Sequence, residues 1–284
     1  HAKIQCSSAP GAGKTLKLTL SVAGLNNTNP TLKYGIPEIG FNQTSFSPFN
    51  VLSNGNNFGT LSLDGGDLIE LRGLNFGRPT SKYIPYELGS NGSNVDLERV
   101  TYGRLGTEYE ARNCYTSYVN ETMSFIQCTT VPGLGLAHQW IITVRGQKSR
   151  YLLRNERNEL TDENNNIVKY ATSYKRPLIT RIYSTSGRPT NGQNIVILIG
   201  KHFGTNINGA SYQIRFLKSS ADVSATYTVG FKTLKSNYEN VCTANDECIS
   251  FALPEGYGTR YIDLKVTHED YTRNAFDSVA NKFV

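Results

Sequence analysis

IQCTTVPGLG, at residues 126–135, is the most informative part of this sequence because the chain repeats it. A close copy, IQCSSAPGAG, occupies residues 4–13, and a weaker third copy ends in PEGYG. The prolines of the three copies are Pro10, Pro132 and Pro254, and both 132 − 10 and 254 − 132 equal 122. A regular internal repeat indicates consecutive copies of one structural unit.

An alternating run of apolar residues follows each copy. Counted from the proline of the copy, apolar residues stand at positions +8, +10 and +12. Such alternation is typical of a strand with one buried face. The sequence therefore predicts an all-β protein made of three consecutive pieces of one kind of domain, the first of them incomplete. The residues concerned are Leu18, Leu20 and Val22; Trp140, Ile142 and Val144; and Ile262, Leu264 and Val266.

A second landmark also occurs twice. GGDLIELRGLNFG at residues 65–77 aligns without gaps with GQNIVILIGKHFG at residues 192–204. The pattern predicts a strand that runs into a glycine-rich turn closed by a buried aromatic ring, Phe76 in one copy and Phe203 in the other. Further strands are expected near residues 108–118, 124–130, 212–217, 227–235 and 248–253.

Prolines also mark the predicted domain boundaries. Pro37 and Pro177 each open a domain, because proline suits the first position of a strand, and a tyrosine stands three residues before each of them. In the first piece we expect a strand from Lys14 to Val22 and then a polar loop around Asn26. The predicted domains are 1–35, the last part of an upstream domain or a segment completing a neighbouring subunit; 36–174, with a loop insertion at 41–60 and a polar hairpin or long loop at 150–168; and 175–284.

Cysteines and sequons indicate an oxidising, extracellular compartment. Cys114 and Cys128 lie in one repeat, Cys242 and Cys248 lie in the next, and Cys6 is left over at the position of Cys128. We expect a secreted or cell-surface glycoprotein that carries N-linked glycans. The four N-x-S/T sequons are at Asn26, Asn42, Asn91 and Asn120.

Composition argues against several classes of partner. Apolar residues make up 38% of the chain and charged residues 18%, as in a globular protein. No apolar run approaches the roughly 20 residues that a membrane-spanning helix needs. The net charge is +6, but lysine and arginine are scattered among acidic residues, so we expect no nucleic-acid partner. We expect no catalytic site, no cofactor and no metal.

Together the proline start, the paired glycine-rich strand, the cysteine pair and the P-x-G-x-G corner resemble the IPT/TIG family. These immunoglobulin-like domains occur in transcription factors and cell-surface receptors. The resemblance covers nearly the whole chain. It implies tandem β-sandwiches of roughly seven strands each, in two antiparallel sheets, that serve as rods, spacers or protein-binding surfaces and not as enzymes.

The resemblance also implies a bridge between Cys114 and Cys128 in the first full domain. The last domain departs from the pattern, since Ser250 stands where Cys128 stands earlier, and a bridge from Cys242 to Cys248 would close only a tight loop. Cys6 is expected to pair across chains or with an upstream segment.

Two other motifs have simpler explanations. SAPGAGKT, which begins at Ser8 and ends at Thr15, resembles a phosphate-binding loop, but Ser8 replaces its first glycine and a strand pattern follows where a helix is required. Asp162 and Glu163, which are followed by three asparagines, could bind calcium weakly, but they lack the regular oxygen-ligand spacing of a calcium loop, so a polar turn is expected.

His1 suggests the copper site of lytic polysaccharide monooxygenases, which are also β-sandwiches. That site needs a second histidine, for which His138, His202 and His268 are candidates. Because residues 4–13 copy an internal stretch, we expect His1 to lie inside a domain piece and not to bind metal.

The favoured functional hypothesis is a structural or adhesive glycoprotein whose repeats associate with further copies or with upstream repeats into a rod or filament. The main alternative is a receptor ectodomain that binds a protein or glycan partner through the insertions. Two further alternatives are a DNA-binding domain of the IPT/TIG type and an accessory module of a carbohydrate-active enzyme.

Overall fold

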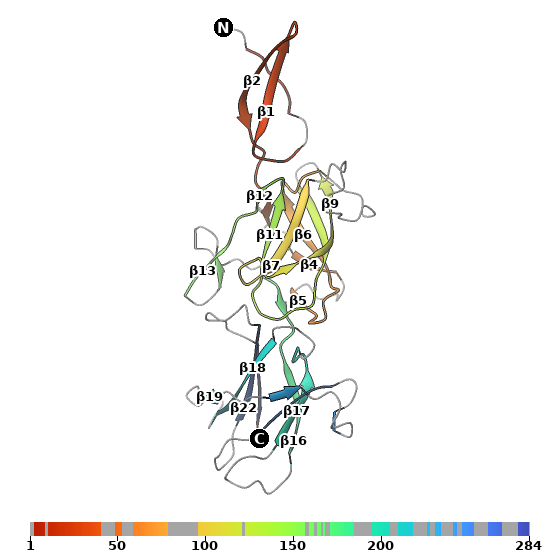
Figure 1. Ribbon diagram of the computed structural model, residues 1–284, viewed down its shortest axis with the longest axis vertical. Coiled ribbons are helices and arrows are strands. Elements are labelled where there is room, and N and C mark those ends of the chain that lie inside the picture. Colours follow the sequence, from red (N-terminus) through yellow and green to blue (C-terminus); the bar gives the residue numbers. More distant parts are fainter. Residues whose placement is uncertain are drawn as a thin grey trace. The chain divides into compact units, whose positions relative to one another are not determined.

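Every regular element in the described part of the computed structural model is a β-strand, and Figure 1 colours these strands by their position in the sequence. The all-β prediction is therefore confirmed. The structure describes the whole chain except residues 1–2, 9–10, 41–48, 53–58, 79–95, 121–122, 157–158, 162–163, 166, 168–170, 185–194, 205–209, 218–225, 228–230, 234–240, 243–245, 253–260, 269–277 and 284.

The chain divides into two compact units. Unit 1 consists of residues 1–61, 65–131 and 137–172. Unit 2 consists of residues 62–64, 132–136 and 173–284. The proline-glycine corner at 132–136 therefore clusters with the residues that come after it in the chain.

Unit 1 contains two antiparallel sheets of four or five strands. The first has the order β3-β6-β10-β9, with β4 also paired to β6, and the second has the order β12-β11-β7-β8. The strands of the first sheet are β3 (Glu38–Ile39), β4 (Phe49–Val51), β6 (Leu68–Leu74), β9 (Arg112–Asn120) and β10 (Met123–Thr129). Those of the second are β7 (Leu97–Gly103), β8 (Tyr109–Glu110), β11 (Gln139–Val144) and β12 (Gln147–Lys148).

An aromatic cluster lies in the core of unit 1. The rings of Tyr102 and Trp140 stack with centroids 4.2 Å apart, and Tyr109 lies 5.2 Å from Tyr102. The indole N–H of Trp140 donates to Thr172 Oγ1 at 3.0 Å, so the buried polar atom of the tryptophan is satisfied. Trp140 is 4% exposed and is the single tryptophan of the chain, so its fluorescence reports on unit 1.

Unit 2 contains two four-stranded antiparallel sheets. Their orders are β16-β17-β21-β20 and β19-β18-β22-β23. The first comprises β16 (Leu178–Ser184), β17 (Ile195–Lys201), β20 (Phe231–Thr233) and β21 (Glu247–Ala252). The second comprises β18 (Ala210–Leu217), β19 (Thr226–Tyr227), β22 (Tyr261–His268) and β23 (Ser278–Phe283).

The two units repeat one strand order. One sheet of each unit has corresponding strands in the same order: β3-β6-β10-β9 in unit 1 and β16-β17-β21-β20 in unit 2. The other sheet of each unit also has corresponding strands in the same order: β12-β11-β7-β8 in unit 1 and β23-β22-β18-β19 in unit 2. The two landmarks recognised in the sequence fall on corresponding strands, β6 with β17 and β11 with β22.

Residues 16–32 form a separate two-stranded hairpin of β1 (Leu16–Val22) and β2 (Leu25–Leu32). The expected polar loop around Asn26 is wrong, because Ala23 and Gly24, with φ of 49° and 81°, make a two-residue turn that returns the chain at once. The same turn joins β11 to β12, where Arg145 and Gly146 have φ of 44° and 73°.

Of the two forms expected for the insertion at 150–168, a hairpin or a long loop, the structure contains a hairpin. Its strands β13 (Leu153–Arg154) and β14 (Leu160–Thr161) pair antiparallel. Most of the insertion at 41–60 lies outside the described residues, apart from β4 and β5 (Thr60–Leu61). A further short strand, β15 (Ser173–Tyr174), precedes β16.

Sequence patterns located most strands but missed three long ones: β2, which was expected to be a loop, β7 and β23. The predicted strands near 108–118, 124–130, 212–217, 227–235 and 248–253 correspond to β8–β9, β10, β18, β19–β20 and β21. β7 was missed because the charged Glu98 and Arg99 interrupt its alternation, and both are exposed. β23 was missed because the apolar and polar residues of its sequence, SVANKF, do not alternate.

Candidate functional site

The most informative local site is the proline-glycine corner, which has the same geometry in both copies that the structure describes. In the first copy, the backbone N–H of Tyr34 donates to the carbonyl of Gly13 at 2.9 Å. A Cβ on Gly11 would lie 3.0 Å from the Tyr34 ring, so the ring packs directly on the glycine. The corner is therefore held by the tyrosine that stands three residues before the next domain's proline.

The second copy repeats these contacts with different residues. The N–H of Tyr174 donates to the carbonyl of Gly135 at 3.0 Å, and a Cβ on Gly133 would lie 2.6 Å from the Tyr174 hydroxyl. Tyr174 is 1% exposed. The third corner, near Pro254, lies outside the described residues. The glycines of the first two corners thus have like surroundings, and Pro10 itself also lies outside the described residues.

Gly133→Ala is expected to destabilise unit 2 by about 1–3 kcal/mol, because the new methyl group would overlap the buried Tyr174 ring. Differential scanning calorimetry measures the effect as a lower transition temperature. Adding Tyr174→Phe removes the nearest oxygen and should restore part of the loss. A Gly133→Ala protein as stable as the parent would contradict this packing.

Gln147, on β12, anchors the first corner to unit 1. Its side-chain oxygen accepts from the Gly13 N–H at 3.2 Å, and its side-chain amide donates to the Tyr34 carbonyl at 3.1 Å. Gln147 is 6% exposed, so both bonds are shielded from water. One amide group thus connects both sides of the corner to the strand next to β11.

A glycine in a central strand is a second feature common to the two units. A Cβ on Gly73 of β6 would lie 2.6 Å from Phe76 Cζ, and one on Gly200 of β17 would lie 2.6 Å from Phe203 Cζ. Both phenylalanines are buried, at 1% and 0% exposure. The predicted turn closed by a buried aromatic ring is confirmed, and only glycine leaves room for that ring.

A buried carboxylate clamps the tip of the β11–β12 turn in unit 1. Asp96 is 2% exposed and accepts from the Nε atoms of Arg78 at 2.9 Å and Arg145 at 3.0 Å. Burial alone would raise the pKa of Asp96, but the hydrogen bonds from Arg78 and Arg145 outweigh it and lower the pKa to about 2. No sequence pattern indicates this cluster, because its members lie 18 and 49 positions apart.

The structure contains two disulfides, in corresponding sheets of the two units. Cys114 and Cys128 join β9 to β10, with Cα atoms 4.2 Å apart. Cys242 and Cys248 close a short loop at the start of β21, with Cα atoms 6.2 Å apart. Disulfides are typical of proteins in oxidising compartments.

The two disulfides lie on opposite faces of these sheets. Cys128 pairs with Ile69, four residues before Gly73, whereas the residue four before Gly200 pairs with Phe251. Phe251, not Ser250, therefore occupies the position of Cys128. The predicted alignment was one residue out, and such a slip reverses the face of a strand.

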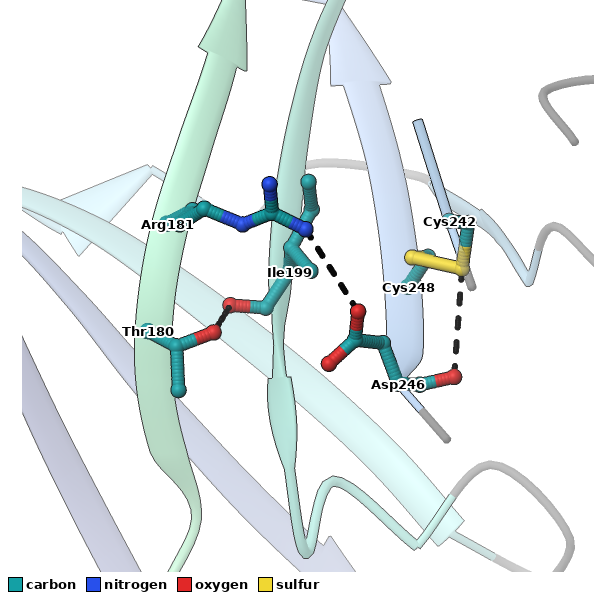
Figure 2. Close-up of a disulfide and its surroundings, with 6 residues drawn as sticks. All are labelled: Thr180, Arg181, Ile199, Cys242, Asp246 and Cys248. Carbon is teal, nitrogen blue, oxygen red and sulfur yellow. Dashed lines mark hydrogen bonds and ion pairs between the residues drawn. A yellow bond between two sulfur atoms is a disulfide. The ribbon is translucent and has the colours of Figure 1, made fainter. Parts of the chain in front are cut away.

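On its own face, the Cys242–Cys248 disulfide covers a small apolar cluster. Cys248, Ile197 and Ile199 are buried together, and Cys242 packs against them. Figure 2 shows the bridge beside an ion pair in which Arg181 of β16 approaches Asp246 at 3.5 Å. The sulfur of Cys242 in this disulfide also lies 3.8 Å from the carbonyl oxygen of Asp246. This grouping is a structural clamp at the start of β21.

Only part of the predicted modification sites can be located. Asn26 is exposed and lies on β2, opposite Ser21. Asn120 ends β9, and Asn42 and Asn91 lie outside the described residues. Cys6 is an exposed free thiol.

The candidate ligand motifs take structural positions. The residues after the phosphate-loop-like segment form strand β1 and not a helix, so the N-terminal amides that bind phosphate are missing there. His138 is fully buried, with its ring 5.7 Å from that of Tyr109. His202 lies in the turn after β17, where burial lowers its pKa. His268 ends β22, and His1, Asp162 and Glu163 lie outside the described residues.

Within the described ranges, no helix is long and apolar enough to cross a membrane. Among the same residues, no group of three or more His, Cys, Asp or Glu side chains could hold a metal ion. No model of a known protein family matches the chain, and no curated protein matches it.

Proposed function

We propose that this chain is a non-enzymatic extracellular glycoprotein, structural or adhesive, built of tandem immunoglobulin-like domains of the IPT/TIG type that associate end to end. The repeated corner carries the proposal. Gly11 with Tyr34 and Gly133 with Tyr174 make the same contacts, so the same corner recurs along the chain. Recurrence of one structural element along a chain is expected of a linear array of like repeats.

The strand order supports the immunoglobulin-like part of the proposal. Immunoglobulin domains place strands A, B, E and D in one sheet and strands C, F and G, with additions, in the other. With β16 as strand A, the sheets of unit 2 have the orders A-B-E-D and C′-C-F-G. Unit 1 has the same two orders when β3 is strand A.

Two observations support an extracellular location. The Cys114–Cys128 and Cys242–Cys248 disulfides need an oxidising compartment to persist. The sequon at Asn26 is exposed on a strand whose neighbouring hydroxyls, Thr19 and Thr28, are exposed as well. A glycan at this position would point into solvent.

The chain secreted from eukaryotic cells is expected to carry N-glycans and to associate as its concentration rises. Light scattering should show a mass that increases with concentration, and negative-stain electron microscopy should show linear arrays. Treatment with N-glycosidase should lower the mass of the parent chain. In an Asn26→Gln variant the decrease in mass should be smaller by one glycan. Monomers at all concentrations, without any glycan, would contradict the proposal.

A receptor ectodomain is the second candidate, and the β13–β14 hairpin favours it. Tyr151, Leu153 and Ile167 in this insertion are 51%, 55% and 54% exposed, which is unusual for side chains of this kind close together in sequence. A chain that stays monomeric and binds a defined partner through residues 150–168 would favour this reading over assembly.

A further inference from the structure

The β1–β2 hairpin leaves uncovered the residues that its counterparts bury. Leu18, Leu20 and Val22 are 49%, 45% and 60% exposed. The residues at the same distances from Pro132 and Pro254 are at most 4% exposed. The same strand pattern is therefore core in two copies and surface in the first.

The edge of β1 is also uncovered. In unit 1, β11 lies between β12 and β7, and in unit 2, β22 lies between β23 and β18. Among the described residues, β1 pairs with β2 alone. β1 therefore lacks the neighbour that β7 and β18 provide in the complete copies, and an unpaired edge of this kind is a template for another strand.

The segment before the first corner shows the same deficit. Ile4 is 63% exposed and Cys6 is an exposed free thiol. Their counterparts Ile126 and Cys128 are both 0% exposed, on β10. Two parts of the first copy, separated by the corner, are thus exposed where their counterparts in the other copies are buried.

The two faces of the hairpin differ in polarity, and this difference identifies the face that a partner would cover. Thr19 bonds to Thr28 through their hydroxyls on one face, where Ser21 also lies opposite the Asn26 sequon. The opposite face bears the apolar side chains of β1 and Leu25, which is 79% exposed. A glycan on the polar face leaves the apolar face free for a partner.

The charge of this region specifies the partner further. Residues 1–37 contain four lysines and no aspartate or glutamate. In unit 1 the corresponding turn is held by acidic residues at the start of β7: the Gly146 N–H donates to Glu98 Oε1 at 3.0 Å, and the Arg145 N–H donates to the Asp96 carbonyl at 3.0 Å. A strand with alternating apolar residues, whose first residues accept hydrogen bonds from the N–H groups of the turn, complements β1, and the lysines, which lie away from the turn, favour a partner that also carries carboxylates.

We propose that the hairpin is an acceptor for the front half of a further immunoglobulin-like repeat. Its strand equivalent to β7 pairs antiparallel with β1, and its sheet covers Leu18, Leu20 and Val22. A cysteine equivalent to Cys114 forms a disulfide with Cys6, and the two thiols pass two electrons and two protons to an oxidant disulfide of the secretory compartment, which is reduced to a dithiol. This inference rests on the proposed end-to-end assembly and names the surface and the partner that make one junction of it.

The test uses the 284-residue chain and a synthetic peptide, DLERVTYG, with the sequence of residues 96–103 as a stand-in for the missing strand. Hydrogen–deuterium exchange is followed in residues 16–25. At a peptide concentration about ten times its Kd, exchange of the β1 amides is expected to slow about tenfold. A peptide with serine in place of its leucine, valine and tyrosine should give no protection.

Two matched variants locate the binding face. Leu20→Lys should weaken peptide binding at least tenfold, since it places a charge among the apolar contacts (about 1.4 kcal/mol for each tenfold). Ser21→Lys adds the same charge on the opposite face and should leave binding within about twofold of the parent. Because Trp140 lies in the core of unit 1, its fluorescence verifies that this core remains folded in both variants.

The natural occupant is identified from native material by mapping the disulfide of Cys6. A peptide from the front half of another repeat, linked to Cys6, is the expected result. Cys6 linked to a second Cys6, or found as a free thiol, overturns the proposal, as does a β1 strand that the peptide never protects. Arrays that form equally well with Leu20→Lys would overturn this inference alone, whereas peptide protection in a chain that never assembles would contradict the proposed function alone.

Discussion

Gly73→Ala is expected to destabilise unit 1 by about 3 kcal/mol or more, the largest effect of any single methyl group considered. The added Cβ would collide with the backbone carbonyl of Glu38 and would lie 2.6 Å from the Phe76 ring. Neither can move away cheaply, because Glu38 is held in β3 by its pairing with Leu74, and Phe76 is 1% exposed. Urea denaturation followed by Trp140 fluorescence measures the loss.

Gly200→Ala is the matched control in the other unit. A Cβ there would collide with the Leu178 carbonyl and would lie 2.6 Å from the Phe203 ring, so the local cost is the same. Trp140 belongs to unit 1, so this variant should leave the Trp140 midpoint unchanged while lowering a second calorimetric transition. Equal shifts of the Trp140 midpoint in both variants would contradict the division into two units.

Asp96→Asn is expected to cost about 2–4 kcal/mol. The substitution leaves Arg78 and Arg145 without the carboxylate that both approach within 3.0 Å, at a site where the aspartate is 2% exposed. The tip of the β11–β12 turn should loosen with it, because the Arg145 N–H bonds to the Asp96 backbone. Chemical denaturation at pH 7 gives the free energy of unfolding, and Trp140 reports it.

Acid should remove the same stabilisation in the parent protein. The pKa of Asp96 is lowered from 3.8 to about 2, so the folded state favours the ionised form. A group of this kind contributes stability above its unfolded-state pKa and loses it as the pH falls through the folded-state pKa. About 2 kcal/mol should therefore disappear between pH 4 and pH 2, and the Asp96→Asn variant should lack this component. A parallel pH profile in the two proteins would refute the assignment.

The sequence predicted strands in which buried and exposed residues alternate, but it did not predict contacts between residues that are far apart in the chain. β6, β11, β17 and β22 could be predicted because successive residues on one face of each are apolar. The glycine-phenylalanine packing could also be predicted, since both members lie within four residues of each other in each copy. The Asp96 cluster could not be, because its two arginines come from different parts of the chain.

The errors have equally local causes. β2 looked like a loop because its sequence is rich in asparagine and threonine, yet the positive φ of Ala23 and Gly24 returns it along β1. Ser250 was matched with Cys128 because spacing was counted from Pro254, whereas the strand pairing to β17 fixes the register one residue away. Counting along a sequence cannot detect a one-residue change of length between a strand and a corner.

The corner at 132–136 has an evolutionary consequence. This corner lies inside the predicted domain 36–174, before β11 and β12, but clusters with the residues from Ser173 onward, and the Gly133 N–H donates to the Leu63 carbonyl within that unit. The boundaries predicted from the sequence and those of the compact unit therefore differ at the corner. A recombination event with its breakpoint directly after Gly135 would part the corner from Tyr174, so viable shuffling of such modules should favour crossovers downstream of the tyrosine.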